Sequence, residues 1–170
     1  MTFQNSVDSS SAQATRLTTR NATNATEPIS MAVCCLAIIL ALVGGVGVAS
    51  GLVLRHLVQT LPLWGGVALG LRRSRATGWV GLPLFLFWLL LMGLIWLYLL
   101  GISHILSGHF SSIEIAMTII VGAASMLGIT MFAQFRSSLS VTSAASLFLI
   151  VAAIQLACFR ASFLPAIAHH

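Results

Sequence analysis

The hydrophobic positions of this chain fall into long runs and do not alternate with polar positions. Four runs, at residues 31–54, 79–102, 113–135 and 141–159, are almost free of charged side chains. A helix needs about 20 apolar residues to cross the hydrocarbon of a bilayer, because lipid offers no partner to free backbone groups. We therefore predict an all-α, polytopic integral membrane protein built as a bundle of transmembrane helices.

A fifth run, at residues 57–71, is shorter and less apolar than the others. It contains Gln59, Thr60 and Pro62, together with several glycines. A run of this length fits either a short transmembrane helix or a re-entrant or interfacial segment. Five transmembrane helices are the favoured prediction, and four helices plus such a segment are the alternative.

The arginines help to choose between these topologies, because positive charge near membrane helices favours the cytoplasmic side. Arg72, Arg73 and Arg75 form the densest group of basic residues. We place that group in the cytoplasm. If residues 57–71 cross the membrane, six of the eight arginines then lie on the cytoplasmic side. If residues 57–71 do not cross, five of the eight arginines lie there. The six are Arg16, Arg20, Arg72, Arg73, Arg75 and Arg136. The distribution favours five helices and a cytoplasmic N-terminus.

The chain begins with a polar segment of different composition. Residues 1–30 are rich in Ser, Thr, Asn and Ala. Such a segment buries too little apolar surface to offset the entropy lost on ordering, so we predict a disordered N-terminal tail. The transmembrane domain then covers residues 31–160, and residues 161–170 form a short C-terminal tail.

The overall composition agrees with a membrane setting. The chain is 58% hydrophobic and 6% charged, with a mean hydropathy of +1.02. A water-facing surface needs far more charge. The net charge is +5, but the arginines are scattered between apolar runs and form no basic stripe, so no nucleic acid is expected as a partner. Lipid is the expected surrounding, and the use of arginine without lysine suggests a GC-rich bacterial genome and hence a bacterial inner membrane.

Two GxxxG motifs indicate close contacts between helices. Gly47 and Gly51 form the first motif, and Gly66 and Gly70 form the second. Small residues at this spacing let two membrane helices approach closely. We predict helix packing at these four glycines. Packing within one chain is favoured over self-association or contact with other membrane protein subunits.

The segment that precedes the run at 113–135 carries a helix-start motif. In Ser111-Ser-Ile-Glu114, the Ser111 hydroxyl can accept a hydrogen bond from the amide of Glu114, and the Glu114 carboxylate can accept one from the amide of Ser111. The negative charge also suits the positive end of a helix dipole. Helix capping is therefore the favoured role of Ser111 and Glu114.

Three histidines are candidate ligand-binding residues. In the five-helix topology His56, His104 and His109 lie on the outer face, as do the C-terminal His169 and His170. Imidazoles there can bind a metal, ligate haem or hydrogen-bond a quinone. Ligation needs two imidazoles to converge, and on one continuous helix His104 and His109 would lie about 140° apart. Histidines tolerated at a wet interface are the favoured interpretation, and the cofactor and any metal stay unknown.

The sequence carries little sign of catalysis or transport. No ionisable side chain is expected deep within a span, and we find no nucleophile elbow, HExxH motif or phosphate-binding glycine loop. An enzyme acting alone is therefore not favoured. The leading hypothesis is a non-enzymatic accessory, scaffold or assembly subunit. The alternative is a membrane redox or ligand-binding protein that uses the outer-face histidines for haem, quinone or metal, and a small oligomeric pore is the third.

Overall fold

The computed structural model describes residues 28–102, 111–134 and 139–168, and every regular element among them is a helix. The long helices are the first helix Pro28–Ser50, α3 Val53–Leu71, α4 Thr77–Leu99, α5 Ser112–Gln134 and α6 Val141–Ala161. A short α7, Pro165–Ala168, follows α6. Within the first helix, η1 (Leu40–Gly47) is π-helical and α2 (Val48–Ser50) is its last α-helical turn.

Four of these helices are long and apolar enough to cross a membrane: the first helix, α4, α5 and α6. They correspond to the four long hydrophobic runs of the sequence, and they indicate a multi-pass membrane protein. α3 is not among the four, because its Arg55, His56 and Gln59 lower its mean hydropathy. The expected count of five transmembrane helices is therefore not confirmed.

The boundary between the first two helices differs from the prediction. The first helix ends at Ser50 and not at residue 54, because Gly51 adopts a left-handed backbone with φ of 71°. The amide of Leu52 then donates to the carbonyl of Gly47 at 2.9 Å, the closing bond of a glycine-terminated helix. α3 accordingly begins at Val53, four residues before the predicted 57–71 segment. Arg55 and His56, expected in a connection, lie in the first turn of α3.

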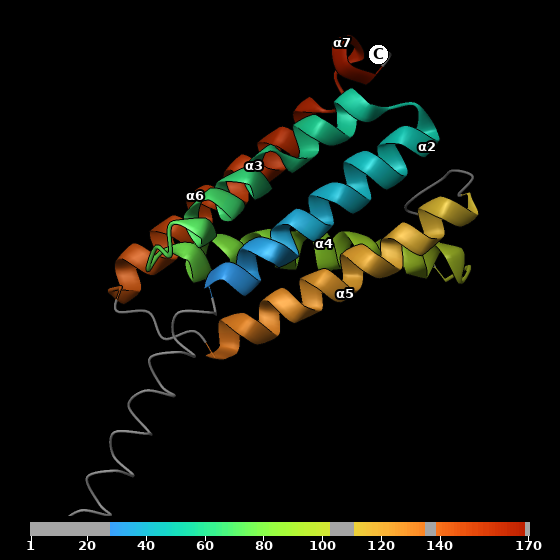
Figure 1. Ribbon diagram of the computed structural model, residues 1–170. Helices are drawn as coiled ribbons and strands as arrows, with labels where there is room; N and C mark the ends of the chain where they lie inside the picture. The colour runs from blue at the N-terminus through green and yellow to red at the C-terminus, as the bar shows by residue number, and fades with distance from the viewer. Residues whose placement is uncertain (1–27, 103–110, 135–138, 169–170) are drawn as a thin grey trace, which may run out of the picture.

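Consecutive long helices run in opposite directions (Figure 1). Their contacts form a closed ring in the order first helix, α3, α6, α4 and α5. α5 contacts the first helix at η1, which closes the ring. α3 and α4 also touch each other across the ring. α3 is therefore a full member of the ring and does not lie outside it.

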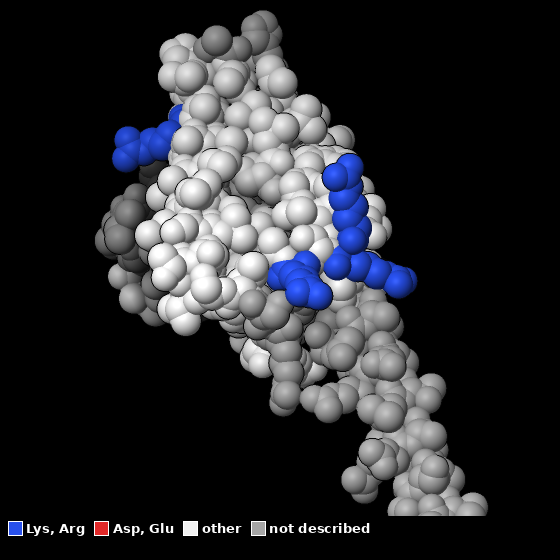
Figure 2. All heavy atoms as spheres, turned by 90° about the vertical axis from the view of Figure 1, so that its left-hand side faces the viewer, with Lys and Arg blue, Asp and Glu red and all other residues white. Residues whose placement is uncertain are grey.

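The two ends of the ring carry different residues. One end, which we call the arginine end, holds the loop at residues 72–76 between α3 and α4, where Arg72, Arg73 and Arg75 are all exposed. Figure 2 views the molecule from this side. Arginine side chains are exposed on the surface in this view, and no acidic side chain is visible. The opposite end, which we call the turn end, holds the turn at residues 51–52, the end of α4 and the start of α5 (Figure 1).

The second glycine motif lies at the contact between α3 and the first helix. A Cβ added to Gly66 would lie 3.0 Å from Sγ of Cys35, and one added to Gly70 would lie 2.7 Å from Cβ of Ala32. The absence of a side chain at these positions lets the two helices touch. This contact lies within one chain, as the favoured interpretation expected.

The two glycines of the first motif, Gly47 and Gly51, have different roles. A Cβ on Gly47 would lie 3.3 Å from Cα of Val53 at the start of α3, so Gly47 does lie at a close contact. A Cβ on Gly51 would meet no atom of the described residues within 4 Å. The prediction of a packing role for Gly51 is wrong, because its left-handed backbone ends the helix there.

The tightest glycine contact is one that the sequence motifs did not indicate. Gly128 of α5 faces the fully buried Phe85 of α4, and a Cβ on Gly128 would lie 2.5 Å from the Phe85 ring. α4 and α5 share extensive contact, and Phe85 is part of the main buried cluster. The Phe85 side chain thus fills the space that the missing side chain of Gly128 leaves open.

We expect Gly128→Ala to destabilise the protein by about 1–3 kcal/mol, because the added methyl group would overlap the Phe85 ring in a packed core. The measurement is the unfolding temperature in detergent. Gly122→Ala is the matched control on the same helix, since a Cβ there meets nothing within 4 Å in the part of the chain that the structure describes. Equal unfolding temperatures for the two variants would contradict this contact.

Candidate functional site

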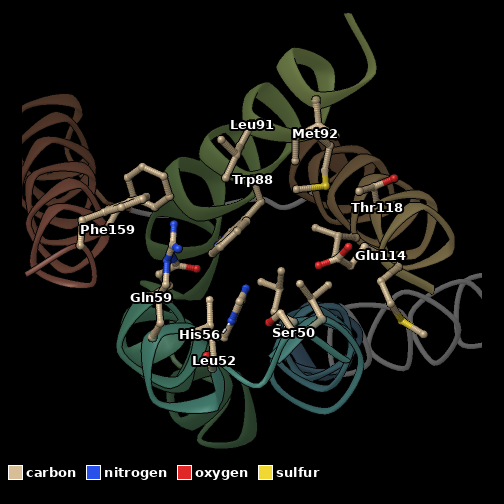
Figure 3. Close-up of a pocket in the computed structure, with 17 residues that line it drawn as sticks. Ser50, Leu52, His56, Gln59, Trp88, Leu91, Met92, Glu114, Thr118 and Phe159 are labelled. Atoms are coloured by element: carbon tan, nitrogen blue, oxygen red, sulfur yellow. Dashed lines mark hydrogen bonds between the residues drawn. The ribbon is translucent and has the colours of Figure 1, made fainter. Parts of the chain in front are cut away.

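A cavity of about 360 Å³ lies inside the ring near the turn end. All five long helices contribute to its walls, as Figure 3 shows. Most of the wall is apolar. The apolar and aromatic lining residues are Leu42, Val46, Leu52, Trp88, Leu91, Met92, Ile95, Met117, Val121, Phe159 and Phe163. Polar side chains from α2, α3 and α5 also line it, namely Ser50, Arg55, His56, Gln59, Glu114 and Thr118.

α3 supplies the most polar wall. Arg55 and Gln59 are four residues apart, and His56 and Gln59 are three apart, so helical periodicity brings all three to one side. Nδ1 of His56 lies 2.9 Å from the carbonyl oxygen of Leu52. A carbonyl only accepts, so Nδ1 carries the proton, and in the neutral ring Nε2 keeps a lone pair. The His56 ring points toward the cavity in Figure 3.

α5 supplies an acidic wall opposite α3. The amide of Ser111 donates to Oε2 of Glu114 at 2.7 Å, and the amide of Glu114 donates to the Ser111 hydroxyl at 3.2 Å. Both hydrogen bonds expected of a capping box are therefore present. The Glu114 carboxylate also faces the cavity in Figure 3. Capping thus holds a carboxylate in place at the edge of the cavity.

α4 and the region after α6 complete the site with aromatic rings. Trp88 is only 1% exposed, and its Nε1 has no hydrogen-bond partner within the described residues. The guanidinium carbon of Arg55 lies 4.0 Å from the ring centroid of Phe163, a cation–π distance, while Nε of Arg55 has no hydrogen-bond partner among the described residues. The two nitrogens are enclosed by protein atoms and expose almost no surface to the cavity.

A buried polar cluster fastens α3 to α6 beside the cavity. Nε2 of Gln59 donates to the hydroxyl of Ser162 at 2.9 Å, and that hydroxyl donates to the carbonyl of Phe159 at 2.6 Å. Nε2 of Gln155 donates to the backbone carbonyl of Gln59 at 3.2 Å. The bonds of Gln59 to Ser162 and of Gln155 to Gln59 are buried, where an unpaired polar group is costly. The cluster therefore fixes the position of the α3 wall.

The predicted histidine site is only partly covered by the structure. His56 lines the cavity, and Glu114 lies across from it. His104 and His109 lie outside the described residues, so their convergence on His56 stays a prediction. Within the described residues, no group of three or more His, Cys, Asp or Glu side chains is placed to hold a metal ion.

Several lining residues were not singled out by sequence reasoning. Arg55, Gln59 and Trp88 line the cavity, and none of them was assigned to a site from the sequence. The spacing of Arg55 to Gln59 and of Glu114 to Thr118, four residues in each case, was a usable sign of polar faces on α3 and α5. Trp88 had no such sign, because α4 is apolar on all sides.

Comparison with protein-family models, with curated proteins and with solved structures found no match to this chain. The class of the protein therefore rests on its helices and its cavity. It is an all-helical, multi-pass membrane protein with a small, mostly apolar cavity lined by its helices.

Ser162→Ala should destabilise the protein by about 1–3 kcal/mol, because it leaves Nε2 of Gln59 buried without an acceptor. Thermal unfolding in detergent measures the effect. Ser146→Ala is the matched control, since Ser146 lies on the exposed face of α6 and should unfold like the parent protein. If Ser162→Ala is as stable as Ser146→Ala, the Gln59–Ser162 bond does not fasten α3.

Proposed function

We propose that this protein is a five-span bacterial inner-membrane protein that binds a small lipid-soluble molecule in the cavity at its turn end. The cavity is the single observation that carries the proposal. It combines apolar walls with polar groups converging from facing helices, which is the usual make-up of a ligand-binding site. A volume of about 360 Å³ lies within the range of such sites, near its lower limit.

The proposed fifth span is α3. Its 19 residues would extend about 28 Å along the helix axis, close to the thickness of the hydrocarbon layer. It also takes part in the ring, and its two ends lie at the two ends of the other long helices (Figure 1). Arg55 and His56 would then lie near the membrane interface, where long polar side chains reach water.

The proposed orientation follows the positive charge. Arg72, Arg73 and Arg75 at the arginine end would face the cytoplasm, together with the N-terminus. The turn end, with Arg55 and Arg160, would face outward. The cavity would therefore be reached from the outer side of the membrane.

Ligand binding explains features that a scaffold does not need. A helix bundle that serves only as an accessory or assembly subunit has no use for a cavity into which His56, Glu114 and Arg55 project. Cavities inside well-packed proteins are few, and polar groups left unpaired in them are costly. The scaffold hypothesis stays a prediction, and the cavity favours the ligand-binding alternative.

The five-span topology predicts that Ser50 and Arg73 lie on opposite sides of the membrane. Ser50→Cys and Arg73→Cys would each be made in a background whose native cysteines are replaced by alanine. A membrane-impermeant maleimide applied to spheroplasts should label the cysteine at Ser50 but should label the one at Arg73 only after permeabilisation. A His104→Cys variant is the reference for the outer side. Labelling of the Ser50 and Arg73 positions from the same side would remove α3 from the list of spans.

The binding proposal predicts that filling the cavity removes a bound molecule. Leu91 lines the cavity, whereas its neighbour Leu90 is 65% exposed and faces outward, so Leu91→Trp and Leu90→Trp form a matched pair. Each protein would be purified from native membranes in mild detergent, and its solvent extract compared by mass spectrometry. A small molecule should accompany the parent and Leu90→Trp but should be reduced at least tenfold in Leu91→Trp. Identical extracts from all three proteins would refute binding in this cavity.

A further inference from the structure

The accessible polar groups of the cavity lie together at the turn end. Ser50 ends the first helix, and Arg55 and His56 lie in the first turn of α3. Glu114 lies in the first turn of α5. All four line the cavity and keep part of their surface exposed. They form the rim of the cavity, where these helices begin and end (Figure 1).

The walls become apolar and buried with distance from this rim. Along α5, Met117 and then Val121 follow Glu114, and Val121 lies about 10 Å farther along the helix axis than Glu114. Met117 is half-buried, whereas the exposed fraction of Val121 is 0%. The other apolar lining residues that are at most 5% exposed are Leu42, Trp88 and Met92. In the described part of the chain, these buried residues form an apolar floor.

The polar side chains nearer the floor already have partners within the protein. Nε2 of Gln59 donates to the Ser162 hydroxyl at 2.9 Å, and the Thr118 hydroxyl donates to the carbonyl of Ile115 at 2.7 Å. Nε1 of Trp88 exposes almost no surface to the cavity. A bound molecule therefore meets polar partners at the rim and apolar contacts at the floor, and an amphiphile has this distribution of polarity.

The rim carries one charge of each sign. Arg55 lies on the α3 side, where its guanidinium carbon is 4.0 Å from the ring centroid of the exposed Phe163. Glu114 lies on the α5 side, where the Ser111 amide donates to its carboxylate at 2.7 Å. Figure 3 shows Glu114 across the cavity from His56, the neighbour of Arg55 on α3. A head group with one positive and one negative charge can pair with both residues, whereas a singly charged head group is repelled by one of them.

The volume of the cavity suits one alkyl chain. A cavity of about 150 Å³ holds a benzene molecule, so about 360 Å³ holds roughly twice as many carbon atoms, on the order of a dozen. Met92 and Met117 line the cavity, and flexible thioether side chains adapt to a chain of variable shape. A second chain of similar length would not fit.

We propose that the cavity takes up the alkyl chain of a zwitterionic single-chain lipid, such as a lysophospholipid, with the chain directed to the floor and the head group at the rim. The ammonium group pairs with Glu114, and the phosphate group pairs with Arg55. This inference rests on the proposed ligand-binding function, because it names the class of molecule for the same cavity. In the proposed orientation of the protein, the head group lies at the outer surface of the membrane.

Quenching of Trp88 fluorescence by bromine measures the direction of the chain. Trp64→Phe, Trp79→Phe and Trp96→Phe together leave Trp88 as the single indole of the full chain. The probes are dodecyl phosphocholines that carry bromine either at the terminal carbon or beside the head group, added to detergent-free protein in an amphipathic polymer. Terminal bromine should quench saturably and at least about threefold more strongly, because the floor lies about 10 Å from the rim and bromine quenches only near contact.

Val46→Phe and Val48→Phe form a matched pair in this single-tryptophan background. Val46 lines the cavity, whereas Val48 is 64% exposed and does not line it. The added volume in Val46→Phe should weaken binding of the terminally brominated probe about tenfold, and Val48→Phe should behave like the parent protein. Equal quenching in the two variants would show that the probe does not enter the cavity and would overturn the inference.

The head group is tested with three probes that share the terminally brominated chain and carry phosphocholine, trimethylammonium or sulfate. Phosphocholine should bind about threefold or more tightly than the other two, since charge pairs at an exposed rim contribute modestly. Glu114→Gln should shift the preference toward sulfate and Arg55→Met toward trimethylammonium, each about twofold or more. Gln at position 114 can keep the capping contact with Ser111. Arg160→Met is the control, because Arg160 is exposed and does not line the cavity, and it should leave the preference unchanged.

The possible failures separate this inference from the proposed function. Equal quenching from both bromine positions, or stronger quenching from the position beside the head group, would overturn the proposed direction of the chain. Equal affinities for the three head groups, or a preference unchanged in both Glu114→Gln and Arg55→Met, would overturn the zwitterion assignment. In each case, a native molecule that is lost from Leu91→Trp would leave ligand binding in place. Absence of that molecule together with absence of quenching would overturn both proposals.

Discussion

The contact between α3 and the first helix determines much of this structure. Membrane helices gain little from apolar burial against each other, because lipid is equally apolar, and so they depend on close backbone approach and on internal hydrogen bonds. Gly66 and Gly70 allow that approach at one end of α3, and the bond from Gln59 to Ser162 fastens its other end to the segment after α6. Because α3 is held on both sides, the five helices close into a ring.

Closure of the ring creates a cavity whose polar groups come from facing helices. α3 brings Arg55 and His56, and α5 brings Glu114, which is already fixed by its capping bonds to Ser111. These polar groups therefore line one cavity from opposite walls.

The π-helical segment of the first helix belongs to the same arrangement. η1 contains Gly44, Gly45 and Gly47, and a Cβ on Gly45 would lie 2.6 Å from Cγ of Met117 in α5. Wider helical turns occur often at functional sites, since they re-aim the side chains that follow. Here the segment brings α5 close to the first helix on the side where the cavity lies. The π-helical segment and the cavity of the proposed binding function thus lie in the same part of the ring.

The sequence by itself determined the class of protein, the four long apolar helices and the capping of α5 by Ser111 and Glu114, because each depends on residues close together in the chain. It did not determine that Gly51 ends the first helix, since a GxxxG pattern does not distinguish a packing glycine from a left-handed one. Only the tertiary structure decided which polar residues share a cavity. Arg55, Trp88 and Phe163 are far apart in the chain, and they meet through helix contacts that no local pattern encodes.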